Sequence, residues 1–433
     1  MPVSENRWPG LDKVSFDVMS GTRNGFVTLF WVVLGLGLAR SAFILALVVK
    51  HRRIPPIHSH ETPKVAFVVP AYNEENAVAN CLRTLLKSDY ENFEIIVVDD
   101  GSTDDTFEEV QKLSTDRRIR VFAQLNHGKW GALNAAIRNT DAEILVCIDA
   151  DTQVRPDALG HLVKHFSNPR VGAVAGKVVV GNRVNLLTRL QALEYITAQN
   201  FERRAHDMLN SMLVVPGALG AWRTEALKAA GMYSPDTVTE DADMTVAVNR
   251  AGYRITYEDE AVAYTEVPET VRLLLSQRLR WSFGMFQTAW KHKGAIRERT
   301  SVGLISIPDL VVFGYLFALL APLADFFLLL LVWNQVFGDP QQLAYGGLAA
   351  AAPVGFAYLA LPLFEMFVAG YALKADKRES MWMLLLFPFQ RFFYRQLLYF
   401  SVLRALARAV MGSFTGWGIK KRMRRDLLAM AEG

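Results

Sequence analysis

The sequence predicts an α/β domain between long apolar helices, and three observations lead to this prediction. Short β-branched runs alternate with helical periodicity through the middle of the chain, a pattern typical of a doubly wound parallel sheet. Hydrophobic residues make up 51% of the 433 residues and are concentrated at the two ends of the chain. Acidic pairs follow two of the predicted strands, where open α/β sheets bind their ligands.

The N-terminal part of the chain contains the first predicted span. The run from Gly25 to Val49 is long enough to cross a bilayer and is interrupted only by Arg40. It is too long for the core of a signal peptide, and no small-residue cleavage site follows it. We therefore expect an N-terminal segment over residues 1–24 and a retained transmembrane helix over residues 25–50.

The middle of the chain, residues 63–294, is the predicted α/β domain. Helical periodicity over Asn73 to Leu86 separates the first two predicted strands. Strand-helix alternation predicts that the strands are parallel and buried on both faces. The four runs predicted as strands are Val65–Val69, Glu94–Val98, Arg118–Phe122 and Glu143–Ile148.

Residues 302–414 are predicted to form transmembrane and interfacial helices, followed by a basic cytoplasmic tail over 415–433. Two runs, from about Ile307 to Val336 and from about Leu348 to Leu373, are long enough to span. The region from Met381 to Phe414 carries four arginines, which favours an interfacial or re-entrant helical pair over a single tilted span.

Basic clusters predict the orientation of the chain. They follow the first, third and fourth apolar regions, whereas the connection from Val336 to Gly347 has no Lys or Arg. The positive-inside rule then predicts a multi-pass protein of the inner (plasma) membrane with its α/β domain in the cytoplasm. The clusters account for most of the net charge of +4, which indicates a lipid bilayer as partner and no nucleic acid. Cys81 and Cys147 are the only cysteines, and we expect no disulfide.

Acidic motifs follow the second and fourth predicted strands. They are Asp99-Asp100-Gly101-Ser102 and Asp149-Ala150-Asp151. Each alone is compatible with a turn or a helix cap, but two at adjacent strand ends indicate a shared site. An Asp-x-Asp pair can bind a hard divalent cation, Mg²⁺ or Mn²⁺, that bridges carboxylates to substrate phosphates.

Three further segments contain candidate site residues. Tyr72 and Glu74 follow the first strand, where Tyr72 is either a nucleobase contact or a core residue. Lys129 lies in a glycine-flanked loop ahead of a helix, and it is either a diphosphate contact or a solvated lysine. Asp241, in Thr239-Glu240-Asp241, is either an acid at a helix start or a general base that takes a proton from a sugar hydroxyl.

The segment from Gln277 to Trp281 lies just before the C-terminal apolar regions. An arginine supplies a rigid fork of donors for phosphate oxygens. The indole of Trp281 offers a broad face on which a sugar can stack. This segment therefore suits a site that binds a diphosphate and a sugar together.

Five motifs, taken in order, resemble those of processive, membrane-embedded family 2 glycosyltransferases, which include cellulose, hyaluronan, chitin and poly-β-1,6-N-acetylglucosamine synthases. They are Tyr72-Asn73-Glu74, Asp99-Asp100-Gly101, Asp149-Ala150-Asp151, Thr239-Glu240-Asp241 and Gln277–Trp281. The resemblance covers about Lys64 to Trp290. It implies a Rossmann-like GT-A domain and inverting transfer from a UDP-sugar donor to a growing β-linked polysaccharide, which the protein also helps to move across the membrane. Gln390 to Gln396 looks most like the tail of poly-N-acetylglucosamine synthases, which favours UDP-N-acetylglucosamine.

The resemblance also implies a role for each motif. Asp241 would be the catalytic base, and Trp281 would bind the acceptor sugar. Asp149 and Asp151 would hold the metal. The residues implied to bind the nucleotide are Tyr72, Glu74, Asp99, Asp100, Lys129, Asp149, Gln277 and Arg280.

Two alternatives stay open at this point. A single-transfer enzyme acting on a lipid phosphate would share the two Asp motifs, but such enzymes usually lack a Gln-x-x-Arg-Trp element. An inactive homologue could serve as a scaffold or channel subunit. The chain has one clear N-terminal span where two are usual in the resembled group, so it either forms a channel alone or needs a small membrane accessory subunit.

Overall fold

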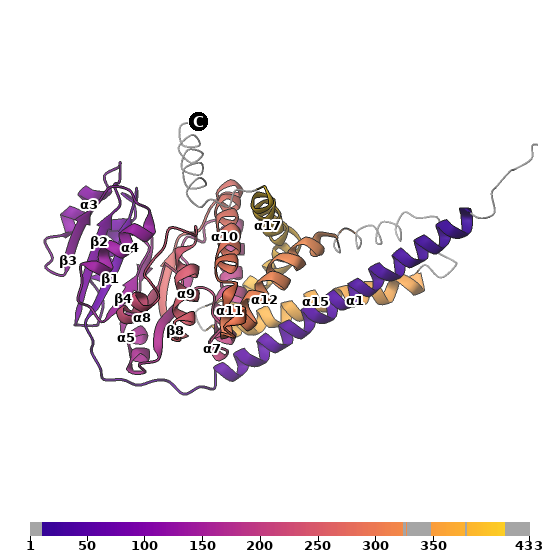
Figure 1. Ribbon diagram of the computed structural model, residues 1–433, viewed down its shortest axis with the longest axis horizontal. Helices are drawn as coiled ribbons and strands as arrows, with labels where there is room; N and C mark the ends of the chain where they lie inside the picture. Colours follow the sequence, from indigo (N-terminus) through magenta and orange to yellow (C-terminus); the bar gives the residue numbers. More distant parts are fainter. Residues whose placement is uncertain (1–10, 324–325, 327–347, 377–378, 412–433) are drawn as a thin grey trace, which may run out of the picture. The chain divides into compact units, whose positions relative to one another are not determined.

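The computed structural model describes residues 11–323, 326, 348–376 and 379–411, and Figure 1 shows the order of their helices and strands. The chain divides into two compact units. The first comprises Met1–Ile44 with Leu319–Phe367, and the second comprises Leu45–Ala318 with Val368–Gly433. All the predicted site residues belong to the second unit.

Long apolar helices occupy much of the first unit and continue into the second. Helix α1 covers Leu11–His51, and α15 covers Leu348–Ala375, which coincides with the third predicted apolar run. Among the described residues, two segments are long and apolar enough to cross a membrane, Trp31–His51 and Val302–Leu323. They coincide with parts of the first two predicted spans, and the total number of spans stays a prediction. The basic tail, residues 415–433, lies outside the described residues.

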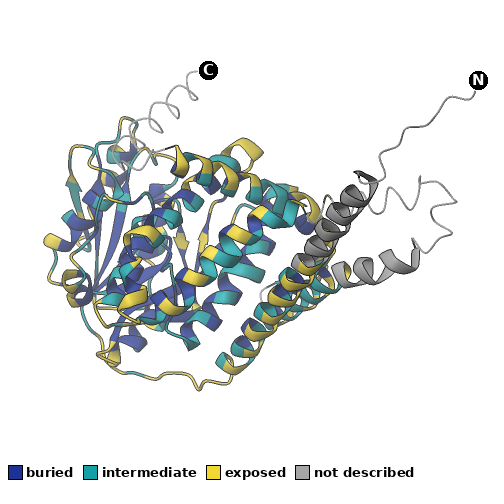
Figure 2. Cartoon of the chain, turned by 45° about the vertical axis from the view of Figure 1, so that its right-hand side comes forward, coloured by how far each residue is buried: buried dark blue, intermediate teal, exposed yellow. Residues whose placement is uncertain are grey.

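The second unit contains an eight-stranded sheet in the order β3-β2-β1-β4-β7-β6-β8-β5. Strands β1 (Val65–Ala71), β2 (Phe93–Asp99), β3 (Ile119–Ala123) and β4 (Ile144–Cys147) match the four predicted strands. All their pairings with one another are parallel, as predicted. Their apolar runs are nearly continuous because helices cover both faces of this part of the sheet. Figure 2 shows buried residues along these strands.

The predicted parallel arrangement holds for β1 to β4, whereas the other half of the sheet is mixed. Strand β7 (Gly220–Arg223) pairs antiparallel with both β4 and β6 (Val171–Val180). Strand β8 (Arg254–Thr265) pairs parallel with β6 and antiparallel with the two-residue β5 (Gln153–Val154). Strands of two and four residues carry too little period-two pattern for their direction to be predicted from sequence.

Helices connect the strands along the chain and pack on the sheet. Helix α2 begins at Val78, five residues later than the predicted start at Asn73, because residues 73–77 form a loop at the site. Trp222 of β7 is the largest fully buried side chain in the described part of the chain, and it packs edge-to-face against Tyr233. The helices of the α/β region are α2 (Val78–Leu85), α3 (Thr106–Leu113), α4 (Lys129–Arg138), α5 (Ala158–Val163), α6 (Leu186–Glu194), α7 (Phe201–Met208), α8 (Thr224–Ala229) and α9 (Glu240–Arg250).

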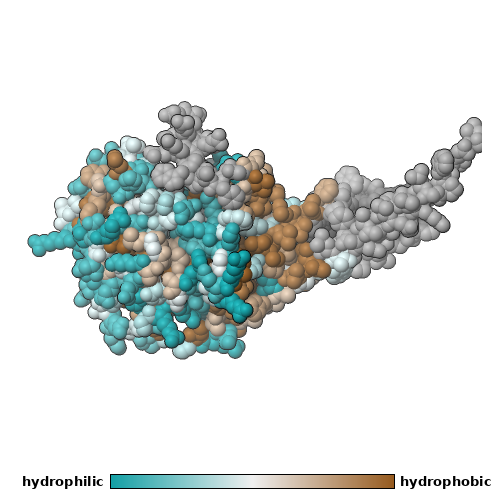
Figure 3. Space-filling model, viewed as in Figure 1, coloured by the Kyte–Doolittle hydropathy of each residue, from teal (hydrophilic) through white to brown (hydrophobic). Residues whose placement is uncertain are grey.

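Helix α10 (Val271–Lys291) carries the Gln277–Trp281 motif. Residues 381–410 follow as short helical segments: η6 (Met381–Leu386), α16 (Phe387–Phe389), η7 (Gln390–Tyr394) and α17 (Arg395–Val410). Helix α17 packs on α10 through a cluster formed by Leu279, Phe283, Ala405 and Ala409. Residues 381–410 are thus helical, and their relation to a membrane stays a prediction. Figure 3 shows that the surface of the α/β region is mainly hydrophilic.

Candidate active site

The loops that follow β1 and β2 are tied together by side-chain hydrogen bonds. The Asn73 side-chain oxygen accepts a hydrogen bond from the Thr103 amide (2.8 Å), and the Ser102 hydroxyl accepts one from the Asn73 amide (3.1 Å). The Thr106 hydroxyl accepts a hydrogen bond from the Glu74 amide (2.7 Å). Asn73 has a φ of 55°, a left-handed conformation that asparagine tolerates better than most residues. These contacts fix Tyr72 and Glu74 beside the end of β2.

Asp99 and Asp100 are both buried, but their carboxylates have different surroundings. Asp100 accepts hydrogen bonds from the Gln124 side chain (2.7 Å) and from the amides of His127 (2.9 Å) and Gly128 (2.8 Å). Asp99 accepts one bond through Oδ2 from the Ser102 amide (3.3 Å), while its buried Oδ1 has no hydrogen-bond partner among the described residues. Asp100 therefore holds the loop ahead of α4, whereas Asp99 retains an acceptor for a ligand.

Lys129 joins two acidic motifs that are far apart in the sequence. Its Nζ lies 2.6 Å from Asp149 Oδ1, at the end of β4, and 3.1 Å from Glu240 Oε1, at the start of α9. Burial acts to lower the pKa of Lys129, but the nearby carboxylates outweigh it and raise that pKa well above its ordinary value. Gly217 packs beside this pair, since a β-carbon there would lie 2.7 Å from Lys129 Nζ.

Glu240 and Asp241 begin helix α9 and have pKa values shifted in opposite directions. Burial acts to raise the pKa of Glu240, but Lys129 and, more weakly, Arg280 lower it. Burial and the adjacent Glu240 raise the pKa of Asp241 to about 6. Asp241 is therefore the more basic carboxylate of the pair, as a proton acceptor near neutral pH should be.

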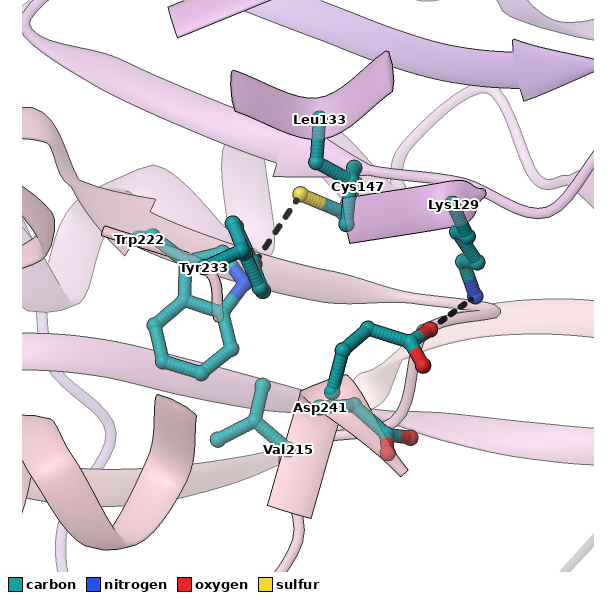
Figure 4. A pocket seen from close by; sticks show the side chains of 9 residues that line it. Lys129, Leu133, Cys147, Val215, Trp222, Tyr233 and Asp241 are labelled. Atoms are coloured by element: carbon teal, nitrogen blue, oxygen red, sulfur yellow. Dashed lines mark hydrogen bonds and ion pairs between the residues drawn. The ribbon is translucent and has the colours of Figure 1, made fainter. Parts of the chain in front are cut away.

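Asp241 lines a narrow cavity with Lys129 and Glu240 (Figure 4). The remaining wall is mostly apolar and includes Cys147, which is a buried free thiol. Its Sγ lies 3.6 Å from the Tyr233 hydroxyl. The other lining residues are Leu133, Val215, Gly217, Trp222 and Tyr233.

Near the end of β4, repulsion acts among three carboxylates, those of Asp149, Asp151 and Glu74. Burial and the neighbouring Asp149 raise the pKa of Asp151 to about 6. Burial, Asp151 and Asp149 raise the pKa of Glu74 to about 7. Among the described residues, no three His, Cys, Asp or Glu side chains converge closely enough to hold a metal by themselves. Hard oxygen donors whose repulsion a cation would relieve nevertheless fit Mg²⁺ or Mn²⁺, provided that substrate phosphates complete the coordination.

Glu266, the first residue after β8, was not predicted from the sequence as a site residue. The Thr265 hydroxyl beside it lies 3.5 Å from Asp151 Oδ1. Glu266 also contributes, after burial and the nearer carboxylates, to the raised pKa values of Asp151 and Glu74. Only its place at the end of a strand could have indicated a role for Glu266, because it does not belong to an acidic pair in the sequence.

Helix α10 brings the last motif toward α9. Arg280 is exposed, and its charge acts on Glu240. Trp281 and Gln277 are half-buried, and the buried Oε1 of Gln277 has no hydrogen-bond partner among the described residues. Arg278, which the sequence did not single out, is buried and pairs with Glu194.

The sheet is mixed, and the predicted acidic motifs lie at the ends of its strands, an arrangement that resembles a GT-A fold. Residues 66–231 match the sequence model of the family described as Glycosyl transferase family 2. The predicted resemblance to family 2 glycosyltransferases is thereby confirmed over this segment.

Relatives that are similar in sequence agree with this resemblance. The chain is 31% identical over 261 residues to a poly-beta-1,6-N-acetyl-D-glucosamine synthase of Staphylococcus aureus, covering 60% of this chain and 63% of that protein. A synthase of the same name from Staphylococcus epidermidis is 29% identical over 261 residues. The chain thus spans less than two thirds of the length of these curated relatives.

A solved structure with a similar fold is a mannosyltransferase from Pyrobaculum calidifontis in complex with GDP-Man and Mn²⁺. It has a TM-score of 0.54 and 20% sequence identity, and the match covers 88% of this chain and 99% of that one. The predicted GT-A fold is confirmed. The roles of the individual site residues stay predictions.

Proposed function

We propose that this protein is a membrane-bound inverting glycosyltransferase that polymerises a β-linked polysaccharide from a UDP-sugar and helps to move it across the membrane. The observation that carries this proposal is the bridge from Lys129 to both Asp149 (2.6 Å) and Glu240 (3.1 Å). It brings the proposed diphosphate contacts beside Asp241, the proposed base. The similarity to staphylococcal poly-N-acetylglucosamine synthases favours UDP-N-acetylglucosamine as donor.

The uridine would bind at the ends of β1 and β2. The buried Oδ1 of Asp99 has no hydrogen-bond partner among the described residues, and a uracil N–H is a suitable donor for it. Tyr72 and Glu74 lie on the loop tied to this strand end. Asp100 would act indirectly, because its carboxylate is engaged by the loop that leads to Lys129.

The diphosphate would lie near Lys129, Gln277 and Arg280. Asp149 and Asp151 would hold Mg²⁺ or Mn²⁺ together with phosphate oxygens, and such a cation neutralises the charge that develops on the leaving diphosphate. Arg280 is exposed and its charge reaches Glu240, so its guanidinium is available to a ligand on this side of the site.

Transfer would begin when Asp241 accepts the proton of an acceptor hydroxyl. The hydroxyl oxygen then attacks the anomeric carbon of the donor sugar, and the bond from that carbon to the diphosphate oxygen breaks. The new glycosidic bond has inverted configuration, and UDP leaves with the bonding electron pair. Trp281 would form the floor for the acceptor sugar, since an indole face suits the apolar face of a pyranose.

Export would use the apolar helices, of which Trp31–His51 and Val302–Leu323 are long enough to cross the inner membrane. The catalytic domain would then lie in the cytoplasm, and a small membrane accessory subunit would complete the channel if this chain alone does not.

The test is synthesis by membranes that contain the full chain, supplied with radiolabelled UDP-N-acetylglucosamine or other UDP-sugars and with Mg²⁺ or Mn²⁺. We expect a long polymer that a β-N-acetylglucosaminidase digests. A short, organic-soluble product would instead indicate transfer to a lipid phosphate. No turnover with any donor would overturn the proposed activity. Membranes carrying Asp241→Asn serve as the negative control.

A further inference from the structure

Arg278 lies in the Gln277–Trp281 motif but has a different environment from Arg280. It is 7% exposed, and its guanidinium forms a bidentate pair with Glu194 of α6. The distances are 2.7 Å from Nη1 to Oε1 and 2.8 Å from Nη2 to Oε2. A bidentate pair fixes the plane of the guanidinium as well as its position.

Tyr394 of segment η7 completes this buried cluster. Its hydroxyl donates a hydrogen bond to Glu194 Oε2 (2.5 Å) and accepts one from Arg278 Nη2 (3.2 Å). Tyr394 is 1% exposed and packs against Leu190 of α6 and Leu274 of α10. The C-terminal helical segment is therefore joined to α6 and α10 by both polar and apolar contacts.

The cluster reaches the proposed acceptor platform through Arg278. The guanidinium carbon of Arg278 lies 4.5 Å from the centroid of the Trp281 ring. A cation at this distance from an indole is attracted to the ring. Since Glu194 and Tyr394 fix the guanidinium, they also restrict the orientations open to the Trp281 side chain.

Stability alone is a weak explanation for these groups. A buried ion pair loses hydration on both partners, and well-packed apolar side chains of similar volume are often as stable. The ion pair instead defines a geometry, because it fixes the Arg278 guanidinium. That guanidinium lies over the half-buried indole of Trp281 in the candidate site.

We propose that Glu194 and Tyr394 are positioning residues that act through Arg278 to orient Trp281 for the acceptor sugar. This inference rests on the proposed function, in which Trp281 is the acceptor platform. The C-terminal segment thus takes part in acceptor binding without touching the sugar. Removing the Tyr394 hydroxyl should weaken acceptor binding and shorten the product, while leaving donor binding intact.

The test compares Tyr394→Phe with Tyr315→Phe in the full chain in membranes. Both changes remove one hydroxyl that contacts the motif region of α10, since the Tyr315 hydroxyl donates to the Ser282 carbonyl (2.7 Å), but Tyr315→Phe leaves Arg278 and Glu194 paired. For Tyr394→Phe we expect the concentration of an N-acetylglucosamine oligosaccharide primer at half-maximal elongation to rise about five- to tenfold, as for the loss of one typical hydrogen bond. UDP binding should stay unchanged, and Tyr315→Phe should match the wild type.

A second readout does not depend on activity. The chain has nine tryptophans, so 5-fluorotryptophan labelling gives a ¹⁹F spectrum in which the loss of one signal in Trp281→Phe identifies Trp281. We expect Tyr394→Phe and Arg278→Lys to shift or broaden that signal, and Tyr315→Phe to leave it in place. An unchanged Trp281 signal, or equal kinetic effects of the two Tyr variants, would overturn the inference. If the wild type turned over no donor, the proposed function would fail, and the ¹⁹F signal would still decide whether Tyr394 positions Trp281.

Discussion

Gly284 of α10 lies against Thr239, the residue that precedes Glu240 and Asp241. A β-carbon at position 284 would lie 2.5 Å from both Cγ2 and Oγ1 of Thr239. The absence of a side chain at Gly284 therefore allows α10 to approach the start of α9, and this contact sets the spacing between the Gln277–Trp281 motif and the proposed base.

Gly284→Ala should reduce sugar transfer, because the added methyl group must displace Thr239 and with it Asp241. We expect kcat to fall by about tenfold or more, as when a catalytic group shifts by about 1 Å. Initial rates with saturating donor measure this effect. Gly160→Ala, in helix α5 with nothing within 4 Å of the added carbon, is the matched control and should keep full activity.

Gly217→Ala should act on donor binding instead. The added methyl group would lie 2.7 Å from Lys129 Nζ, which is the flexible end of its side chain and can move away. The fold should survive, but the contact of Lys129 with Asp149 should be lost, and we expect KM for the UDP-sugar to rise by about three- to tenfold. Gly181→Ala, where the nearest atom is 3.5 Å away, should leave KM unchanged. Equal KM values for both variants would contradict this account of Lys129.

Asp241→Asn should abolish transfer, because an amide cannot accept the proton of the acceptor hydroxyl. We expect a loss of about a hundredfold or more in kcat. UDP affinity, measured by calorimetry, should change little. Asp236→Asn removes an exposed carboxylate that pairs with Lys291, and it should behave as wild type. Lost UDP binding in Asp241→Asn would mean that Asp241 has a structural role.

Glu258 should make the free energy of unfolding of the α/β region depend on pH in the acid range. Burial acts to raise its pKa, but hydrogen bonds from His165 and Lys164 outweigh burial and lower the pKa from 4.5 to about 2. A lowered pKa stabilises the fold above pH 4.5, and that stabilisation is lost as the pH falls toward 2. The shift corresponds to a contribution to the free energy of unfolding on the order of 3 kcal/mol.

Glu258→Gln should therefore lower the free energy of unfolding at neutral pH and flatten its dependence between pH 4.5 and 2. Urea unfolding of the full chain in detergent, followed by proteolysis, measures both effects. Glu298→Gln breaks an exposed pair with Arg250 and should leave stability close to that of the wild type, because solvent screens such pairs. A parallel loss of stability with pH in Glu258→Gln and the wild type would contradict the prediction.

The sequence predicted the parallel half of the sheet because its strands are continuous apolar runs followed by acidic turns. It could not predict β7, whose four residues Gly220–Arg223 look like a loop. It also placed the acids at the strand ends correctly, since the carboxyl ends of parallel strands share one edge.

Arg278 shows why the rest of the site could not be predicted. Arg278 and Arg280 have the same chemistry and stand two residues apart, but a helix turns about 200° between such positions, so they face opposite ways. The partners of Arg278 are Glu194 and Tyr394, which are 84 and 116 residues away in the sequence. No local pattern contains that information, because the pairing exists only once α6, α10 and η7 have packed.

The hydrogen bonds of the Asp100 carboxylate should affect the entropy of nucleotide binding. Both of its carboxylate oxygens are engaged by Gln124, His127 and Gly128, so the segment that leads to Lys129 is ordered before any ligand arrives. The conformational freedom of this loop is lost when the protein folds and need not be lost again when the nucleotide enters. In the proposed arrangement, binding of UDP should therefore have a small unfavourable entropy, and Asp100→Ala should make that entropy more unfavourable because the loop would lose its anchor.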